Sequence, residues 1–229
     1  MSGRDAEPLG GRSERTTVRR NPAGARYDRA TVYAILDEAR YCHVGFLLDD
    51  APVVLPTIHD RVDDALYLHG SRSNRMLRAM TGPAGACVTA TLFDGLVLAR
   101  SLFNHTMHYR SAAVFGYPVL VTERDEKVAA LDHLAEHVLA GRAAEARGPD
   151  ERELALTALV RMEIEEASAK VDTGPPEDEP ADLGLGVWAG VVPAGLTWGE
   201  PVVDRQGTGP AAAAAAAELP PSVRRLLGR

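Results

Sequence analysis

The chain has 229 residues, which is enough for one large domain or two small ones with a real core. Its 45% hydrophobic and 25% charged residues are ordinary for a globular protein and exclude wholesale disorder. A net charge of -7 argues against sequence-independent nucleic-acid binding, which needs many cations, and two cysteines exclude a disulfide framework.

Targeting signals are also absent from the sequence pattern. The N-terminus reads MSGRDAEPLGGRSER, without the apolar core of a secretory signal. No apolar run reaches the roughly 18–20 residues that a membrane span needs. We therefore expect a cytoplasmic protein with neither a membrane nor a nucleic acid as partner.

The two ends differ in composition from the rest of the chain. Residues 1–16 are rich in Gly, Arg and Ser without periodicity, which predicts a disordered, solvated arm. Residues 206–229 contain seven successive alanines at 211–217, which favour helix but provide no amphipathic face for docking. We expect a frayed low-complexity tail there, and a folded domain over 17–205.

The first half of that domain reads as short strands with two helices. Asp28 is a candidate N-cap for a helix that ends near Arg40. Residues 43–48 and 52–58 are strand-like runs joined by an acidic hairpin turn, and 65–70 follow a second acidic turn as a third strand. Ser73 is the predicted cap of a short helix that follows.

The second half continues in the same way. Three more strands are predicted at 86–93, 95–102 and 109–121, then a helix behind a capping box of Thr122 and Asp125, and another helix after Pro149. Residues 159–171 alternate as a closing strand, and a last short strand falls within 185–203. Tight turns between most strands favour a mainly β (α+β) fold: an antiparallel sheet that curls into a barrel with flanking helices.

One motif has the spacing of a zinc site. His133 and His137 belong to HLAEH, the H-x-x-E-H pattern of some zinc proteases, and would share one face of a helix. The sequence places no third ligand beside them, and a catalytic zinc needs three protein ligands. We therefore predict no metal site and keep the metalloprotease only as an alternative to exclude by measuring zinc content.

A polar turn carries the strongest chemical signal. Ser71, Arg72, Ser73 and Arg75 follow a strand and precede a helix, where hydroxyls and guanidinium groups can hold a phosphate. The alternative is a plain N-cap with two solvated arginines. Two further elements fit an aromatic phosphate ligand: Arg110 and Ser111 in a later strand, and the apolar strand VVLPTI, which can run beside a flat ring.

These elements together resemble the pyridoxamine 5'-phosphate oxidase-like FMN-binding split-barrel family. The likeness is to its flavin-nucleotide-binding branch, which includes the nitroimidazole reductases. The matching stretches cover nearly all of residues 17–203: TVRRNPAGARYDRATVYAILDEARYCHVGF, PTIHD, LYLHGSRSNRML, DGLVLARSLFNHTMHYRSAAVFG, IEEASAKVDTGPP and VWAGVVP.

The resemblance implies a six-stranded antiparallel split β-barrel, a homodimer, and FMN bound between the subunits. The implied cofactor contacts are Val54, Leu55, Pro56, Thr57, His69, Ser71, Arg72, Ser73, Arg75, Arg110, Ser111 and Trp188. His69 is the candidate catalytic residue. The chain lacks the arginine and histidine that follow the late tryptophan in the oxidases, which argues against pyridoxamine phosphate as substrate. Asn74 stands where the oxidases have a second cation.

Two functions follow as hypotheses. The first is an FMN-dependent oxidoreductase acting on a small organic acceptor, with nitroaromatic compounds as the candidate class. The second is a non-catalytic protein that carries flavin, haem or deazaflavin on the same barrel. The haem alternative depends on five candidate axial ligands, which are histidines 43, 59, 69, 105 and 108.

Overall fold

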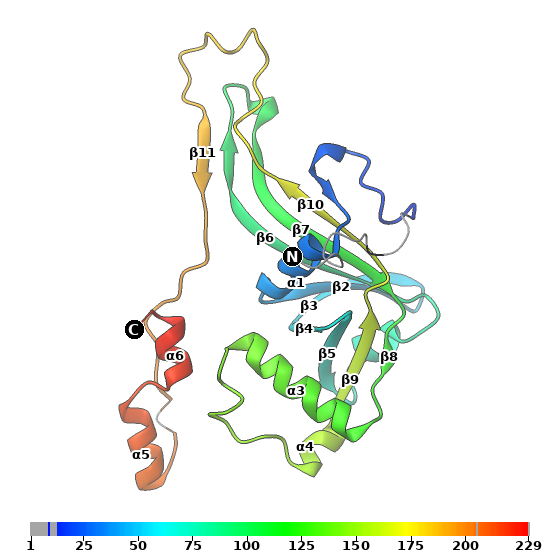
Figure 1. The fold of residues 1–229 in the computed structure, drawn as a ribbon, viewed down its shortest axis with the longest axis vertical. Helices are drawn as coiled ribbons and strands as arrows, with labels where there is room; N and C mark the ends of the chain where they lie inside the picture. Colours follow the sequence, from blue (N-terminus) through cyan, green and yellow to red (C-terminus); the bar gives the residue numbers. More distant parts are fainter. Residues whose placement is uncertain (1–8, 10–12, 205, 229) are drawn as a thin grey trace.

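The computed structural model describes residue 9 and residues 13–204 and 206–228. The strands form a seven-stranded and a four-stranded sheet, and every strand pair is antiparallel (Figure 1). The larger sheet has the order β1 (Ala25–Arg26), β10 (Glu166–Asp172), β7 (Thr106–Gly116), β6 (Ala86–Leu98), β2 (Cys42–Leu48) and β3 (Ala51–Thr57), with β11 (Gly190–Pro193) also on β6. The smaller has the order β4 (His59–Val62), β5 (Ala65–Ser71), β9 (Thr157–Glu163) and β8 (Val119–Leu120). The predicted mainly β, antiparallel fold with flanking helices is confirmed.

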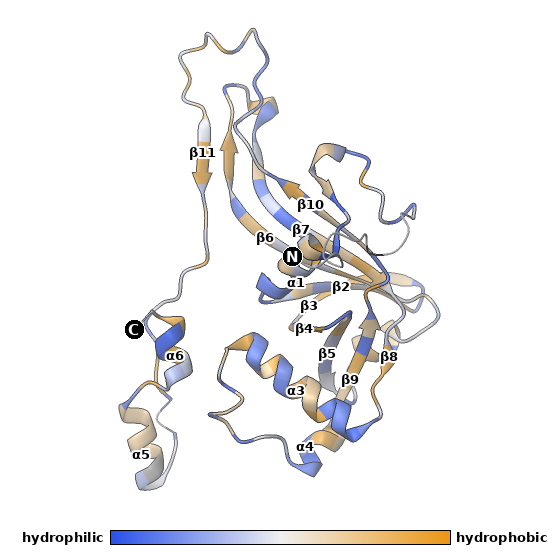
Figure 2. Ribbon diagram, in the orientation of Figure 1, coloured by the Kyte–Doolittle hydropathy of each residue, from blue (hydrophilic) through white to orange (hydrophobic). Residues whose placement is uncertain are grey.

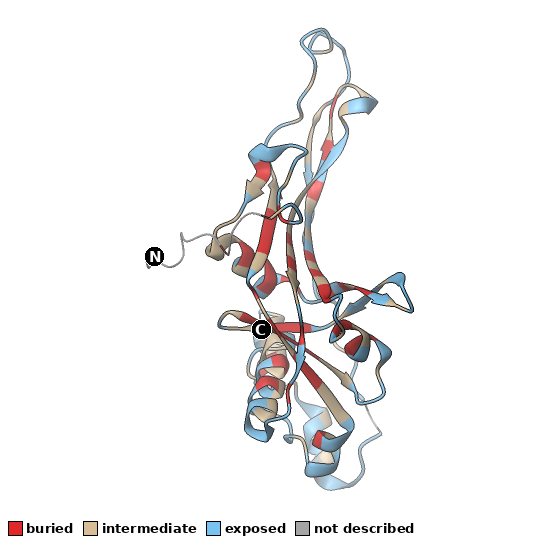
Figure 3. Cartoon of the chain, turned by 90° about the vertical axis from the view of Figure 1, so that its right-hand side faces the viewer, coloured by how far each residue is buried: buried red, intermediate tan, exposed pale blue. Residues whose placement is uncertain are grey.

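Helix α1 (Arg29–Glu38) closes the main core. The side chain of Asp28 caps it by accepting a hydrogen bond from the Thr31 amide at 2.8 Å, as predicted. Val32, Ile35 and Leu36 are buried against the larger sheet, because their spacing puts them on one helix face. Figure 3 shows buried residues concentrated where this helix meets the strands.

Two turns of the larger sheet follow from local chemistry. Asp49 and Asp50 both have positive φ, 52° and 61°, as a two-residue type I′ hairpin between β2 and β3 requires. The predicted strands 86–93 and 95–102 are instead one strand, β6. Its register shifts between Phe93 and Gly95, so a β-bulge replaces the expected turn.

The predicted closing strand 159–171 is wrong as a single element. The chain forms β9 in the smaller sheet and then β10 in the larger one. The change occurs at Ile164, whose amide donates to the carbonyl of Asp64 at 2.8 Å. The buried positions change phase at this bend, from Val160, Met162 and Ile164 before it to Ala167 and Ala169 after it. The adjacent Glu165 and Glu166 mark this shift in the sequence, and a single alternating strand over 159–171 overlooks it.

Helix α3 (Arg124–Val138) covers the smaller sheet and closes a second core. Ala130 and Leu134 pack there with Tyr67 and Leu159. The predicted capping box at Thr122 and Asp125 does not form: Glu123 is the N-cap and makes no side-chain cap bond. Figure 2 shows polar and apolar residues alternating along α3, as an amphipathic helix requires. Helix α4 (Glu151–Leu156) follows Pro149 as predicted and does have a capping box, between Asp150 and Glu153.

The predicted N-terminal arm lies mostly on residues 1–8 and 10–12, outside the described part. Two of its described residues, Leu9 and Thr16, are buried, where composition predicts a solvated tail. Leu9 is 4% exposed within the main core, and its amide donates to the carbonyl of Tyr27. Arg15 pairs with Glu166 and lies over the ring of Phe115. Leu9 and Arg15 therefore each contact the folded domain.

The Ala-rich tail is helical. Helix α5 (Gly209–Ala217) is apolar along its length, and α6 (Pro221–Leu226) follows it. The hydroxyl of Ser222 donates to Glu145 at 2.5 Å, so α6 docks on the connection after α3, where a frayed appendage was expected. Among the described residues, no helix is both long and apolar enough to span a membrane.

Candidate functional site

The turn after β5 holds the predicted phosphate-binding residues together. The hydroxyls of Ser71 and Ser73 are 3.0 Å apart, and the Ser73 amide donates to Ser71 Oγ at 3.3 Å. The Arg72 amide donates to the carbonyl of Leu156 at 2.8 Å, which ties the turn to the end of α4. The turn is therefore a fixed structure with two surface hydroxyls.

The predicted helix cap is one residue too early. Asn74, not Ser73, caps α2 (Arg75–Met80), and its Oδ1 accepts from the Met76 amide at 2.9 Å. Gly70 makes this possible, because a Cβ at that position would lie 2.7 Å from Nδ2 of the Asn74 side chain. Ser73 is thereby left with its side chain at the surface, available to a ligand.

Two arginines supply the charge at this turn. Arg72 and Arg75 are both exposed, and in the described part of the chain neither guanidinium group is paired with a carboxylate. Guanidinium groups and hydroxyls together are the usual donors for a phosphate. The turn therefore has the donor set and the uncompensated positive charge of an anion site.

His69 precedes this turn on the same strand. Its Nδ1 is buried and has no hydrogen-bond partner in the described part of the chain. Burial lowers the pKa of this imidazole, so it is neutral at pH 7. An unpartnered ring nitrogen beside an anion-binding turn fits a site that is completed by a bound group.

Val54, Leu55, Pro56 and Thr57 lie on β3, the edge strand of the larger sheet. Val54 is 64% exposed and faces Gly45 across the ladder, which leaves an open apolar surface. Pro56 lacks an N–H and so blunts this edge against pairing with another strand. Helix α2 packs on β2, the neighbour of β3, so the apolar edge and the phosphate turn belong to one region.

Arg110 lies elsewhere. On β7, its guanidinium group donates to Asp94 at 2.9 Å and to Glu38 at 2.5 and 2.8 Å. These bonds hold the pKa of both carboxyl groups below their ordinary values. In the described part of the chain, Arg110 makes no hydrogen bond to the Ser71–Arg75 turn, and Ser111 points to the opposite sheet face. Sequence reasoning missed both carboxylates, because they are 72 and 16 residues from Arg110 and no local pattern marks them.

Trp188 occupies a third place. It is 64% exposed, and its indole covers Gly190, where a Cβ would lie 2.9 Å from the ring. Gly190 pairs with Leu98 near the far end of β6. One chain therefore divides the predicted contacts among three places: the β3–β5 region, the ion pair at Arg110, and the start of β11.

The H-x-x-E-H pattern serves a structural purpose. His137 is bonded through Nε2 to the carbonyl of Ala39 at 2.9 Å, and its Nδ1 lies 3.6 Å from Asp60. In the part of the chain that the structure describes, no three His, Cys, Asp or Glu side chains are arranged to hold a metal ion.

Comparison with known proteins defines the class. The family model described as pyridoxamine 5'-phosphate oxidase matches residues 28–171. This chain belongs to the pyridoxamine 5'-phosphate oxidase-like family, whose fold binds flavin. No curated protein matches the sequence.

Two solved structures are similar over almost the whole chain. The flavocytochrome Anf3 from Azotobacter vinelandii is 34% identical, with a TM-score of 0.85, and the match covers 93% of this chain and 96% of that one. An FAD and haem binding protein from Mycobacterium smegmatis is 35% identical, with a TM-score of 0.81 and 89% and 97% coverage. A putative 5-nitroimidazole antibiotic resistance protein from Bacteroides thetaiotaomicron is 21% identical, with a TM-score of 0.56, over 64% of this chain and 86% of that one, and shares the fold.

Proposed function

We propose that this protein is a flavocytochrome-like electron-transfer protein that binds FAD and haem. The observation that carries the proposal is the 34–35% identity to a flavocytochrome and to an FAD and haem binding protein, over 89–93% of this chain. The family likeness alone had favoured FMN and treated haem as an alternative. The nitroimidazole resistance protein, at 21% identity, supports no assignment of a nitroaromatic substrate.

The residues around β3 and β5 fit a flavin. Ser71, Ser73, Arg72 and Arg75 would hold phosphate oxygens, and the exposed Val54–Thr57 edge would lie beside the ring. His69 would complete the site with its buried, unpartnered Nδ1. When bound, a flavin supplies hydride and single-electron chemistry, while the protein supplies binding, orientation and electrostatics.

Among the histidines, His105 fits a haem ligand best. Its Nδ1 donates to the carbonyl of Ser101 at 2.8 Å, which fixes the ring, and its Nε2 has no hydrogen-bond partner in the described part of the chain. Metal-ligating histidines characteristically donate their other ring N–H in this way. Leu102 and Phe103 beside it are 88% and 92% exposed, an apolar pair suited to a macrocycle. His59, by contrast, is fully buried with Nε2 already bonded to the carbonyl of Leu36.

We further propose a homodimer as the working unit. The predicted cofactor contacts lie in three separate places of one chain, so a second copy that brings Trp188 or Arg110 to the β3 edge would complete one site. The open apolar surface at Val54 supports the same arrangement. Light scattering should give a dimeric mass that does not depend on bound cofactor, and a monomer that retains flavin would contradict this.

The absorbance spectrum of the purified protein tests the cofactor assignment. Flavin bands together with a Soret band are expected, and chromatography of the released flavin should identify FAD. Flavin bands without a Soret band, even after growth with added haem precursor, would show that the protein binds flavin alone and would contradict the haem assignment. To test the ligand, His105→Gln should shift or abolish the Soret band, whereas His133→Gln, on the exposed face of α3, should leave it unchanged.

A further inference from the structure

A pocket opens on the edge of β6. The residues proposed to hold the flavin phosphate, Ser71, Arg72, Ser73 and Arg75, do not line it. On this side of β6, β2 pairs with residues 87–89 and β11 with residues 95–98, so residues 90–94 have no strand beside them. The end of α1 and the segment after β11 flank this gap and enclose a pocket of about 640 Å³. Ligand pockets typically have volumes of roughly 300–1,000 Å³.

Aromatic side chains form its walls. Tyr41, Phe93 and Trp198 line the pocket from the α1–β2 connection, from β6 and from the segment after β11. They are 56%, 48% and 46% exposed. The chain has only two Trp, six Tyr and four Phe, so three half-exposed aromatic rings around one pocket are a high local concentration of such residues. Aromatic walls of this kind suit a flat ligand.

Two guanidinium groups and two carboxylates line the pocket, so their charges balance. Arg110 bonds to both carboxylates, Glu38 and Asp94, which leaves Arg40 as the lining cation without a hydrogen-bonded carboxylate in the described part of the chain. Arg40 donates to the carbonyl of His137 at 3.0 Å, and its guanidinium group lies over the Trp198 ring, 5.9 Å from the centroid. No carboxylate in the described part of the chain is paired with it, so Arg40 is held in place with donors to spare.

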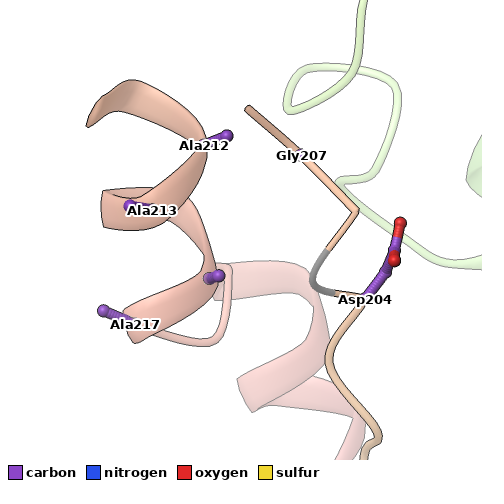
Figure 4. A pocket seen from close by; sticks show the side chains of 6 residues that line it. Asp204, Gly207, Ala212, Ala213 and Ala217 are labelled. Atoms are coloured by element: carbon purple, nitrogen blue, oxygen red, sulfur yellow. The ribbon is translucent and has the colours of Figure 1, made fainter. Parts of the chain in front are cut away.

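A second pocket does not combine aromatic walls with a cation. It has a volume of about 410 Å³ and lies between α5 and the segment that contains Asp204 and Gly207 (Figure 4). Four alanines of α5 form its wall. The only charged side chain in its lining is Asp204, whose Oδ1 already accepts from the Gln206 amide.

We propose that the pocket on β6 binds a flat aromatic anion, with its ring among Tyr41, Phe93 and Trp198 and its acidic group on Arg40. This ligand is proposed as separate from the flavin, because neither the Ser71–Arg75 turn nor the Val54–Thr57 edge lines the pocket. Arg110 is the one lining residue that the homodimer proposal also assigns to the flavin site, so the titration on FAD-saturated protein decides whether the two sites are separate. It is also distinct from haem, since among the described residues no histidine, methionine or cysteine lines the pocket to serve as an axial ligand.

Calorimetric titration of the full chain with 2-naphthoate tests this. We expect saturable binding at one site per chain, and binding of the uncharged 2-naphthamide about tenfold weaker or more, as for loss of a charge-assisted hydrogen bond. Arg40→Gln should weaken naphthoate by the same factor without affecting naphthamide. Arg26→Gln is the matched control, because Arg26 bonds only to backbone carbonyls at the surface.

Two aromatic variants locate the site. Trp198→Ala should abolish naphthoate binding, whereas Tyr117→Ala, an exposed ring outside the pocket lining, should preserve it, with circular dichroism spectra unchanged in both. The titration is then repeated on protein saturated with FAD and on protein saturated with haem, and unchanged affinity supports a separate site. Absence of saturable binding, equal affinity in Arg40→Gln, or loss of binding in either loaded protein would each overturn the proposal.

Discussion

His59 and His137 meet in the interior, with ring centroids 5.2 Å apart, and each donates from Nε2 to a carbonyl at the end of α1. The acceptors are Leu36 and Ala39, so these imidazoles connect β4 and α3 to the main core. Nδ1 of His59 is buried without a partner in the described part, and Nδ1 of His137 lies 3.6 Å from Asp60 Oδ1.

The first prediction concerns acid stability. Burial lowers the pKa of His59 from 6.5 to about 4, so the folded protein resists a proton that the unfolded chain accepts. This group's contribution is therefore fully present above pH 6.5 and is lost as the pH falls towards 4, by roughly 3 kcal/mol in all. His59→Gln keeps an N–H donor but does not titrate.

Urea unfolding at a series of pH values measures the effect. The variant should lose less free energy of unfolding than the natural chain between pH 7 and 4, by up to that amount. Parallel curves for the two proteins would show that His59 is protonated without cost.

The second prediction concerns Arg110. Its hydrogen bonds lower the pKa of Glu38 and Asp94, so their contribution to stability is present above the ordinary carboxyl pKa and disappears as the pH falls through the lowered values. Arg110→Met leaves two carboxylates unpaired. With the pair about one-third exposed, we expect a loss of about 1–2 kcal/mol at pH 7.

The same loss should become smaller in acid, where the carboxylates are neutral. Arg110→Lys is the matched control: it keeps the charge but not the bidentate geometry, and should recover part of the stability. Equal losses for Arg110→Met at pH 7 and pH 3, by denaturant unfolding, would assign the effect to packing instead.

The third prediction concerns the flavin. Arg75→Ala should weaken flavin binding by about 1.5–3 kcal/mol, the scale of a hydrogen bond to a charged group. Arg224→Ala is the control, since Arg224 is a helical arginine on α6 that pairs with Glu218. Fluorescence titration with FAD and with FMN measures both variants. An unchanged affinity in Arg75→Ala would remove this residue from the site.

The fourth prediction concerns the N-terminal segment. Leu9 is 4% exposed in the main core, so Leu9→Ala should cost about 2–3 kcal/mol of unfolding free energy. A chain shortened to begin at residue 17 should be destabilised similarly, because it also loses Leu9. Unchanged melting temperatures for both proteins would show that residues 1–16 are a solvated arm, as their composition predicts.

The sequence by itself determined the features that depend on neighbouring residues. The Asp28 cap, the strand pair joined at Asp49 and Asp50, and the turn from Ser71 to Arg75 were all predictable, because caps, turns and strand alternation are set within a few residues. The antiparallel, mainly β class followed from tight turns between strands, and the family followed from motifs spread along the domain.

Only the tertiary structure decided the rest. The adjacent Glu165 and Glu166 break the strand alternation after Ile164, but only the pairing of the strands places β9 and β10 in different sheets. The pairing of Arg110 with Glu38 joins residues 72 positions apart, and the pocket beside Phe93 exists because two strands cover β6 on either side of a gap. Such contacts depend on how distant segments pack, and no local pattern records them.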